Sequence, residues 1–282
     1  MNIFARARTL IAEGERVAIV RVATVKGSAP REVGAVMLVA RAGILGSVGG
    51  GTLEWKALAE AQRLMSQGPS RQRTVYSLGP DLGQCCGGQV ELETRIYDHS
   101  NVAELEQDNT RGRRLYLFGA GHVGKALVLV LAQTDFDIVW VDPRGGAFPA
   151  AVPGNVQLVA DDDPARVLSK APEQSLVLVM SHSHALDLAV VDASLRHAGI
   201  AATGLIGSAT KRARFEKRLR AAGVAEAAIS ALICPIGIGG IGSKKPEAIA
   251  ISTAAQLLAL DERLKSVAAS PMMDGFTQQV AG

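Results

Sequence analysis

A glycine pattern in the second half of the chain limits the fold more than any other feature. Gly119, Gly121 and Gly124 are spaced as Gly-x-Gly-x-x-Gly, directly after an apolar run typical of a strand and at the start of one typical of a helix. In that setting the pattern is typical of a strand-turn-helix unit whose backbone closely approaches a phosphate. The alternative is that the glycines only permit tight packing of the helix on the strand.

The residues after this turn alternate between strand and helix patterns. Predicted strands cover 114–118, 137–141, 156–159, 176–180 and 202–206, and predicted helices cover 123–132, 164–168, 185–197, 209–221 and 246–260. This alternation predicts an α/β fold with a Rossmann-like, doubly wound parallel sheet. Its ligand crevice is expected at the carboxyl ends of the strands.

The first half has a different pattern and predicts a smaller mixed α+β domain. Helices are expected at 3–12 and 53–65, and strands at 17–25, 35–40, 43–48, 73–78 and 89–97. A polar segment with few core-forming groups is interpreted as a linker. The predicted organisation is an N-terminal domain over 1–98, a linker over 99–113, a Rossmann-like domain over 114–262 and a C-terminal tail over 263–282.

Composition excludes several classes of function. The net charge is only +3 and is spread along the chain, whereas nucleic-acid binding requires concentrated basic charge. The aliphatic run Ala126–Ala132 is too short to span a bilayer, and charged residues interrupt Met1–Glu15 where a signal peptide is apolar. Three cysteines cannot form a paired disulfide framework. We therefore expect a cytoplasmic protein without nucleic-acid or membrane partners.

Several residues near the predicted crevice suit an anionic ligand. Asp142 ends the second strand of the domain and is placed to accept a ribose hydroxyl, as in dinucleotide-binding folds. Arg144 follows two residues later and leaves open a phosphorylated or pterin-like anion instead of NAD. Lys211 and Arg212 begin a helix after a small-residue turn, a combination that binds anions, although a solvated basic face has the same pattern.

The segment Ser181-His182-Ser183-His184, with Asp187 one turn later, follows the fourth predicted strand. His182 and Asp187 are candidates for metal ligands or for polar contacts with a bound group. Two histidines at this spacing lack a metal-site signature, and a helix-capping serine with hydrogen-bonded histidines is the favoured interpretation.

Two of the three cysteines are adjacent in a glycine-rich turn, Cys85-Cys86-Gly87-Gly88. A free cysteine is most often a small buried hydrophobic residue. Here the glycines favour exposed thiols, and backbone amides of the turn can lower a thiol pKa. The turn offers too few ligands for zinc, and His99 is the only histidine of the first half that could serve as a base. The remaining roles for the two thiols are those of a soft metal ligand or a sulfur carrier.

Seven ordered segments together resemble the XdhC/CoxI family, whose members are accessory factors that mature xanthine dehydrogenase and related molybdenum hydroxylases. They are GSAPREVGA, GSVGGGTLEW, LGPDLGQCCGGQVEL, LYLFGAGHVGKAL with WVDPR, SHSHALDL, GLIGSATKRARF and CPIGIGGIGSKKPEAIAISTAAQLLAL. The resemblance covers nearly the whole chain.

The resemblance implies a cofactor carrier and chaperone without turnover of its own. Such a carrier binds the molybdenum cofactor, supports its sulfuration by a cysteine desulfurase and delivers it to apo-xanthine dehydrogenase or a related molybdenum hydroxylase. It also implies a homodimer. The family's Cys-Gly-Gly motif falls on Cys86, Gly87 and Gly88, which makes Cys86 the expected ligand of the cofactor's molybdenum. The complete set of expected cofactor-binding residues is Cys85, Cys86, Gly87, Gly88, Gly119, Gly121, Gly124, Asp142, Lys211 and Arg212.

The chain departs from the family pattern at two places. Ser183 stands where the family more often has an aspartate, and Ser243-Lys244-Lys245 replaces a segment with Gly or Ala and Thr before the proline. Both departures argue against catalysis or metal binding in the crevice.

The sequence is compatible with three functional hypotheses. One is the molybdenum-cofactor carrier, a second is an NAD(P)-dependent oxidoreductase whose first half binds substrate, and a third is a protein-binding chaperone with a relic nucleotide fold. The sequence leaves open whether a nucleotide or molybdopterin fills the crevice, which cysteine acts and which molybdenum enzyme is served.

Overall fold

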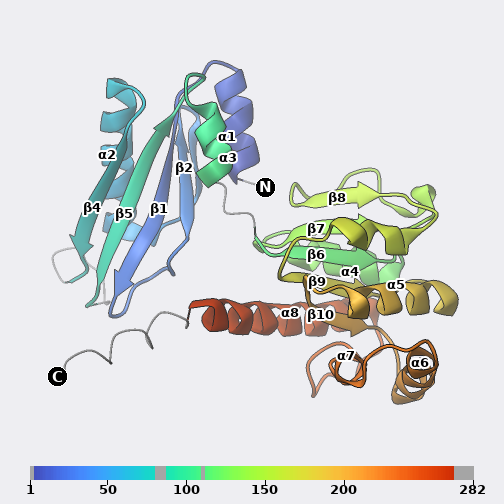
Figure 1. Cartoon of the computed structure of the whole chain (residues 1–282). Coiled ribbons are helices and arrows are strands. Elements are labelled where there is room, and N and C mark those ends of the chain that lie inside the picture. Colours follow the sequence, from blue (N-terminus) through green and yellow to red (C-terminus); the bar gives the residue numbers. More distant parts are fainter. Residues whose placement is uncertain (1–2, 80–86, 109–111, 270–282) are drawn as a thin grey trace, which may run out of the picture. The chain divides into compact units, whose positions relative to one another are not determined.

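The computed structural model describes residues 3–79, 87–108 and 112–269 and divides the chain into two compact units (Figure 1). The N-terminal unit is Met1–Thr110 and the C-terminal unit is Arg111–Gly282. The boundary between them falls within the segment 99–113 that was predicted as a linker. Each unit contains its own five-stranded sheet.

The sheet of the N-terminal unit is antiparallel, with strand order β3-β2-β1-β5-β4. Its strands are β1 (Val17–Lys26), β2 (Val36–Ala40), β3 (Gly43–Gly46), β4 (Arg71–Ser77) and β5 (Gln89–Tyr97). β5 illustrates the sequence pattern that builds it, because buried Val90, Leu92 and Ile96 alternate with charged residues. Successive side chains of a strand point to opposite faces, so this alternation gives β5 one apolar and one charged face.

Helices pack on both faces of this sheet (Figure 1). α2 (Gly51–Gln67) buries one stripe of small and aliphatic side chains, from Leu53 to Leu64, against the even-numbered core residues of β1. α1 (Ile3–Ala12) packs with α3 (Val102–Asp108) against odd-numbered residues of the same strand. The unit therefore has two cores, one on each side of the sheet.

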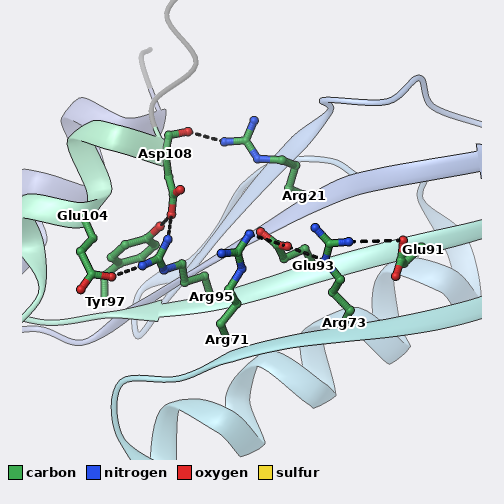
Figure 2. Close-up of polar contacts among 9 residues, drawn as sticks. All are labelled: Arg21, Arg71, Arg73, Glu91, Glu93, Arg95, Tyr97, Glu104 and Asp108. Atoms are coloured by element: carbon green, nitrogen blue, oxygen red, sulfur yellow. Dashed lines mark hydrogen bonds and ion pairs between the residues drawn. The ribbon is translucent and has the colours of Figure 1, made fainter. Parts of the chain in front are cut away.

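α3 differs from the sequence interpretation, because it occupies part of the segment predicted as a linker. Its Leu105 is buried beside α1, and Val102, one helical turn earlier, packs on the same cluster. Figure 2 shows the polar contacts that tie the helix to the sheet: Arg95 of β5 pairs with Glu104 and Asp108. Burial of two apolar residues and ion pairs of two acids therefore hold a helix in an otherwise polar segment.

The charged face of β5 continues to β4 as a ladder of ion pairs (Figure 2). Arg71 and Arg73 both donate to Glu93, at 2.9 Å and 2.7 Å. Burial alone raises the pKa of Glu93, but the hydrogen bonds from the two arginines outweigh it and hold the pKa below its ordinary value.

The sheet of the C-terminal unit is parallel, with strand order β10-β9-β6-β7-β8. Its strands are β6 (Arg114–Phe118), β7 (Asp137–Val141), β8 (Val156–Val159), β9 (Ser175–Val179) and β10 (Ile200–Leu205). The central strands are almost continuously buried and apolar, as expected for a sheet covered on both faces.

Helices cover both faces of the parallel sheet (Figure 1). α4 (His122–Leu131) and α8 (Pro246–Ala269) share one core, and α5 (His184–Arg196), α6 (Ala209–Ala221) and α7 (Glu226–Ser230) share the other. Two 3-10 helices, η2 (Gly145–Ala147) and η3 (Pro164–Lys170), complete the connections. α8 extends beyond residue 260, where the predicted helix ended, into the predicted tail, and 270–282 lie outside the described residues.

The chain order of the strands reverses between β6 and β9, since β6, β7 and β8 follow in one direction and β9 and β10 in the other. This is the point at which doubly wound sheets place their ligand crevice. The fold class predicted from the sequence is confirmed for both units. None of the helices within residues 3–79, 87–108 and 112–269 is both long and apolar enough to cross a lipid bilayer.

Candidate functional site

The Gly-x-Gly-x-x-Gly turn joins β6 to α4 at this reversal point. Gly119 has φ of 115°, and a Cβ atom there would lie 2.4 Å from the carbonyl oxygen of Met180, just beyond β9. A Cβ atom at Gly124 would lie 2.2 Å from the carbonyl oxygen of Gly119. Both positions therefore need glycine for the packing of strands and helix, whatever binds nearby.

Gly121 is the exception among the three glycines. A Cβ atom there would have no described heavy atom within 4 Å, so the backbone faces open space. Gly121 is also the N-cap of α4, and no side chain caps that helix. The first-turn N–H groups of a helix lack intrahelical acceptors and lie at the positive end of its dipole. An uncapped, bare backbone at this position suits an anionic group.

The Asp142 carboxylate lies beside this turn but is occupied by protein donors. Its Oδ2 accepts from the Ala120 N–H at 2.7 Å and from Arg144 Nη2 at 2.9 Å. Its Oδ1 accepts from the Arg144 backbone N–H and from Arg144 Nε, both at 2.9 Å. Burial alone raises the pKa of Asp142, but the hydrogen bonds from Arg144 and Ala120 outweigh it and lower the pKa to about 2.

A second buried carboxylate, Asp187, closes the loop after β9. Its side chain is fully buried, and it accepts hydrogen bonds from the N–H and the hydroxyl of Ser181. Lys211 donates to the other oxygen of Asp187 at 2.6 Å and to the Ile206 carbonyl at 2.9 Å. The loops that follow β9 and β10 are thus joined by a buried ion pair. Both residues were candidates from the sequence, but their pairing was not predicted because they lie in different elements.

The predicted anion-binding pair Lys211 and Arg212 is held mainly by protein contacts. Arg212 donates to Glu216 at 2.7 Å and to the Cys234 carbonyl at 3.1 Å. A hollow of about 410 Å³ lies beside Lys211, and exposed Arg214 contributes to its lining. The role of Lys211 and Arg212 in cofactor binding stays a prediction.

The histidine-rich turn shows a capping role for its serine. Ser183 accepts a hydrogen bond from the Leu186 N–H and caps α5, while His182 and His184 are exposed. Across residues 3–79, 87–108 and 112–269, no group of three or more His, Cys, Asp or Glu side chains is placed to hold a metal ion. The helix-capping part of the favoured interpretation agrees with this geometry, whereas the His182 and His184 side chains have no hydrogen-bond partner among the described residues.

The described part of the cysteine turn packs against the loop after β1. A Cβ atom at Gly88 would lie 2.3 Å from the Ser28 carbonyl oxygen and 2.6 Å from that of Lys26. The Gly88 carbonyl in turn accepts from the Leu78 N–H at 2.7 Å and closes the β4–β5 hairpin. Cys85 and Cys86 lie outside the described residues. Gly88 therefore fixes where the chain carrying the two thiols rejoins the sheet.

A third loop, before α2, meets the loop after β1. A Cβ atom at Gly49 would lie 2.6 Å from Pro30 Cγ. Glu54 folds back over this glycine-rich loop and accepts from the Ser47 hydroxyl at 2.5 Å and from the backbone N–H groups of Val48 and Gly50. Glu54 was not among the site residues predicted from the sequence, although an acid in the first turn after an uncapped glycine start is a signal for such a contact.

We expect Gly119→Ala to destabilise the fold and Gly121→Val to leave its stability nearly unchanged. Gly119→Ala should lower the free energy of unfolding by about 1–3 kcal/mol or more, because its Cβ meets the Met180 carbonyl in a left-handed backbone conformation. Gly121→Val should change it by less than about 1 kcal/mol, since the site is open and its φ of −77° suits valine. Urea unfolding of both variants checks this, and equal losses would contradict it.

We expect Asp142→Asn to lose stability in a pH-dependent way. The pKa of Asp142 is about 2 in the folded state against roughly 3.9 in an unfolded chain, so its contribution is complete above about pH 4 and is lost as the pH falls through about 2. The variant should unfold about 1–3 kcal/mol more easily at pH 7, with a smaller difference at pH 3. Urea midpoints at both pH values measure this. Exposed Asp162→Asn is the control, and a pH-independent difference would contradict the assignment.

Two family models match the chain, and both describe XdhC proteins. The model described as the XdhC Rossmann domain matches residues 115–257, and the model described as the XdhC and CoxI family matches residues 10–77. YqeB, an uncharacterised protein of Escherichia coli strain K12, is 30% identical over 265 residues, which are 92% of this chain and 46% of YqeB. The chain thus spans about half the length of that relative.

A solved structure described as a xanthine dehydrogenase from Bacillus halodurans superposes with a TM-score of 0.73. The two sequences are 22% identical, and the alignment covers 96% of this chain and 98% of that one. This likeness supports the fold of both units. Since the Rossmann match alone covers about half of the 282 residues and the second match lies in the N-terminal unit, the chain belongs to the XdhC and CoxI family.

Proposed function

We propose that this chain is an accessory factor that binds the molybdenum cofactor, holds it during sulfuration and delivers it to apo-xanthine dehydrogenase or a related molybdenum hydroxylase. Membership of the XdhC and CoxI family suggests a role in xanthine dehydrogenase maturation and implies association with enzymes of that type. Binding, sulfuration and delivery are the proposal.

The observation that carries the proposal is the bare backbone of Gly121 at the uncapped start of α4. The preceding residue, Ala120, donates its N–H to the Asp142 carboxylate that also holds Arg144. Molybdopterin has a phosphate at one end, and helix N–H groups with a guanidinium fit that group. The close approach that Gly121 permits is what a bulky phosphorylated ligand requires. The residues present therefore fit the phosphate end of the cofactor.

The thiols are assigned to the other end of the ligand. Thiolates are soft ligands suited to molybdenum, and Cys86 is the better candidate because Gly87 and Gly88 follow it. A thiolate also attacks the outer sulfur of a desulfurase persulfide, so that the donor leaves as a thiolate and the cysteine becomes a persulfide. The third cysteine, Cys234, is buried, and burial raises the pKa of its thiol, so it is unsuited to either task.

When bound, the cofactor supplies the molybdenum centre that the recipient dehydrogenase uses. This chain only needs to bind, orient and release it, and we propose no turnover of a small molecule by the chain alone. A homodimer and a cysteine desulfurase partner belong to the same proposal. Ultraviolet-visible and mass spectra of the purified protein test the ligand directly, since a nicotinamide in place of a pterin would favour an NAD(P)-dependent oxidoreductase.

We expect Gly121→Val to lose cofactor retention. The valine side chain would occupy the open space beside the first turn of α4, where the phosphate is proposed to lie. Molybdenum and pterin that co-purify are measured by elemental analysis and fluorescence. Undiminished binding by the folded variant would place the cofactor elsewhere.

We expect the double variant Cys85→Ala/Cys86→Ala to fail in activating apo-dehydrogenase. Cys86→Ala alone should cause most of the loss, and Cys234→Ala is the matched control that should retain activation. The readouts are molybdenum retention and dehydrogenase activity after mixing, with urea unfolding to verify the fold. Normal retention and activation by the double variant would contradict the thiol assignment.

A further inference from the structure

The Asp142 carboxylate has no capacity left for a ligand. A carboxylate offers about four lone-pair sites, and the Ala120 N–H, the Arg144 N–H and two guanidinium nitrogens of Arg144 account for four hydrogen bonds. The Asp142 side chain is fully buried. In dinucleotide-binding folds, the acid at this position instead accepts hydrogen bonds from the hydroxyl groups of a ribose. A ribose diol would have to displace charge-assisted hydrogen bonds to be recognised in that way.

Arg144 is the group that this arrangement presents to solvent. Nε and Nη2 face the carboxylate, whereas about half of the side chain, 48%, is exposed. A guanidinium has five N–H donors, and those not used on Asp142 have no acceptor among the described residues. The bidentate contact with a buried acid fixes the plane of the guanidinium before any ligand arrives, which reduces the entropy lost on binding.

The same carboxylate oxygen joins Arg144 to the glycine turn. Oδ2 of Asp142 accepts from both the Ala120 N–H and Arg144 Nη2, so the guanidinium lies next to the backbone between Gly119 and Gly121. Gly121 is open on its outer side. A fixed guanidinium beside a bare backbone and an uncapped helix start favours two or more anionic oxygens, and the Asp142 carboxylate is already occupied by protein donors.

We infer that the crevice of the C-terminal unit selects a ligand that places a phosphomonoester, not a ribose diol, at the end of β7, with Arg144 as its partner and Asp142 as a positioning residue. The inference rests on the proposed function only in assigning a phosphorylated ligand to this crevice. It changes the expected role of Asp142 from a ligand contact to the group that orients Arg144.

NAD⁺ and NADP⁺ are suitable probes, because they differ only in the 2′-phosphate that replaces one hydroxyl of the diol. The full-length protein, freed of co-purifying ligand, should bind NADP⁺ at least about tenfold more tightly than NAD⁺ in isothermal titration calorimetry. Arg144→Ala should abolish this preference and improve NAD⁺ binding, since the side chain that occupies Asp142 is gone. Arg144→Lys should keep part of the preference, because the charge remains and the fork is lost.

Asp142→Asn distinguishes a positioning residue from a ribose ligand. It should weaken NADP⁺ binding severalfold, because Arg144 loses its anchor, and leave NAD⁺ binding unchanged. Loss of NAD⁺ affinity alone would show Asp142 to be a ribose ligand and overturn the inference. So would equal or tighter binding of NAD⁺ than NADP⁺ to the wild type, or no binding of NADP⁺. Thermal unfolding of each variant verifies that it is folded.

These outcomes are separate from those of the proposed function. Normal dehydrogenase activation by the cysteine variants contradicts the thiol assignment of the proposed function and leaves the ligand preference of the crevice untouched. Absence of a preference for NADP⁺ in the wild-type protein contradicts the assignment of Arg144 to a phosphomonoester, even where the protein still activates a dehydrogenase.

Discussion

The carboxyl edge of the C-terminal sheet depends on the contact between the Gly119 backbone and the Met180 carbonyl. Gly119 leaves β6 with a positive φ and donates its N–H to Val141 of β7, while its carbonyl accepts the Trp140 indole N–H. Met180 in turn donates its N–H to Phe118. The three central strands are therefore fixed to one another at their ends, which is the rigid support that a site assembled from their loops requires.

Two buried acids then organise the loops on this support in the same way. Asp142 binds a backbone N–H of the glycine turn and the side chain of Arg144, and Asp187 binds the backbone of Ser181 and the side chain of Lys211. The two ion pairs differ in how exposed their cations are. Lys211 is largely buried between its partners, whereas Arg144 remains half-exposed, so only the first pair offers charge to a ligand.

The sequence predicted the elements and the doubly wound parallel class of the C-terminal sheet more fully than the site. Strand and helix periods are local, and the turn at Gly119 and Gly121 identified the strand at which the crevice forms. The sequence did not show that the Arg144 side chain pairs with Asp142, because the direction of a side chain depends on the space left by neighbouring strands. Lys211 was expected to face a ligand, and its acid partner comes from another helix. Cys85 and Cys86 lie outside the described residues, and their roles stay a prediction from the sequence.

The indole of Trp140 is an intrinsic fluorescence probe of the glycine turn. Its ring is fully buried, and its N–H is bonded directly to the Gly119 carbonyl at 2.9 Å. The chain has only one other tryptophan, Trp55, which is 72% exposed and belongs to the N-terminal unit. An indole held in a dry environment emits at shorter wavelength than one in water. The short-wavelength side of the intrinsic tryptophan emission therefore reports on Trp140 and the glycine turn. The long-wavelength side reports on Trp55 and the N-terminal unit, and the protein needs no added label.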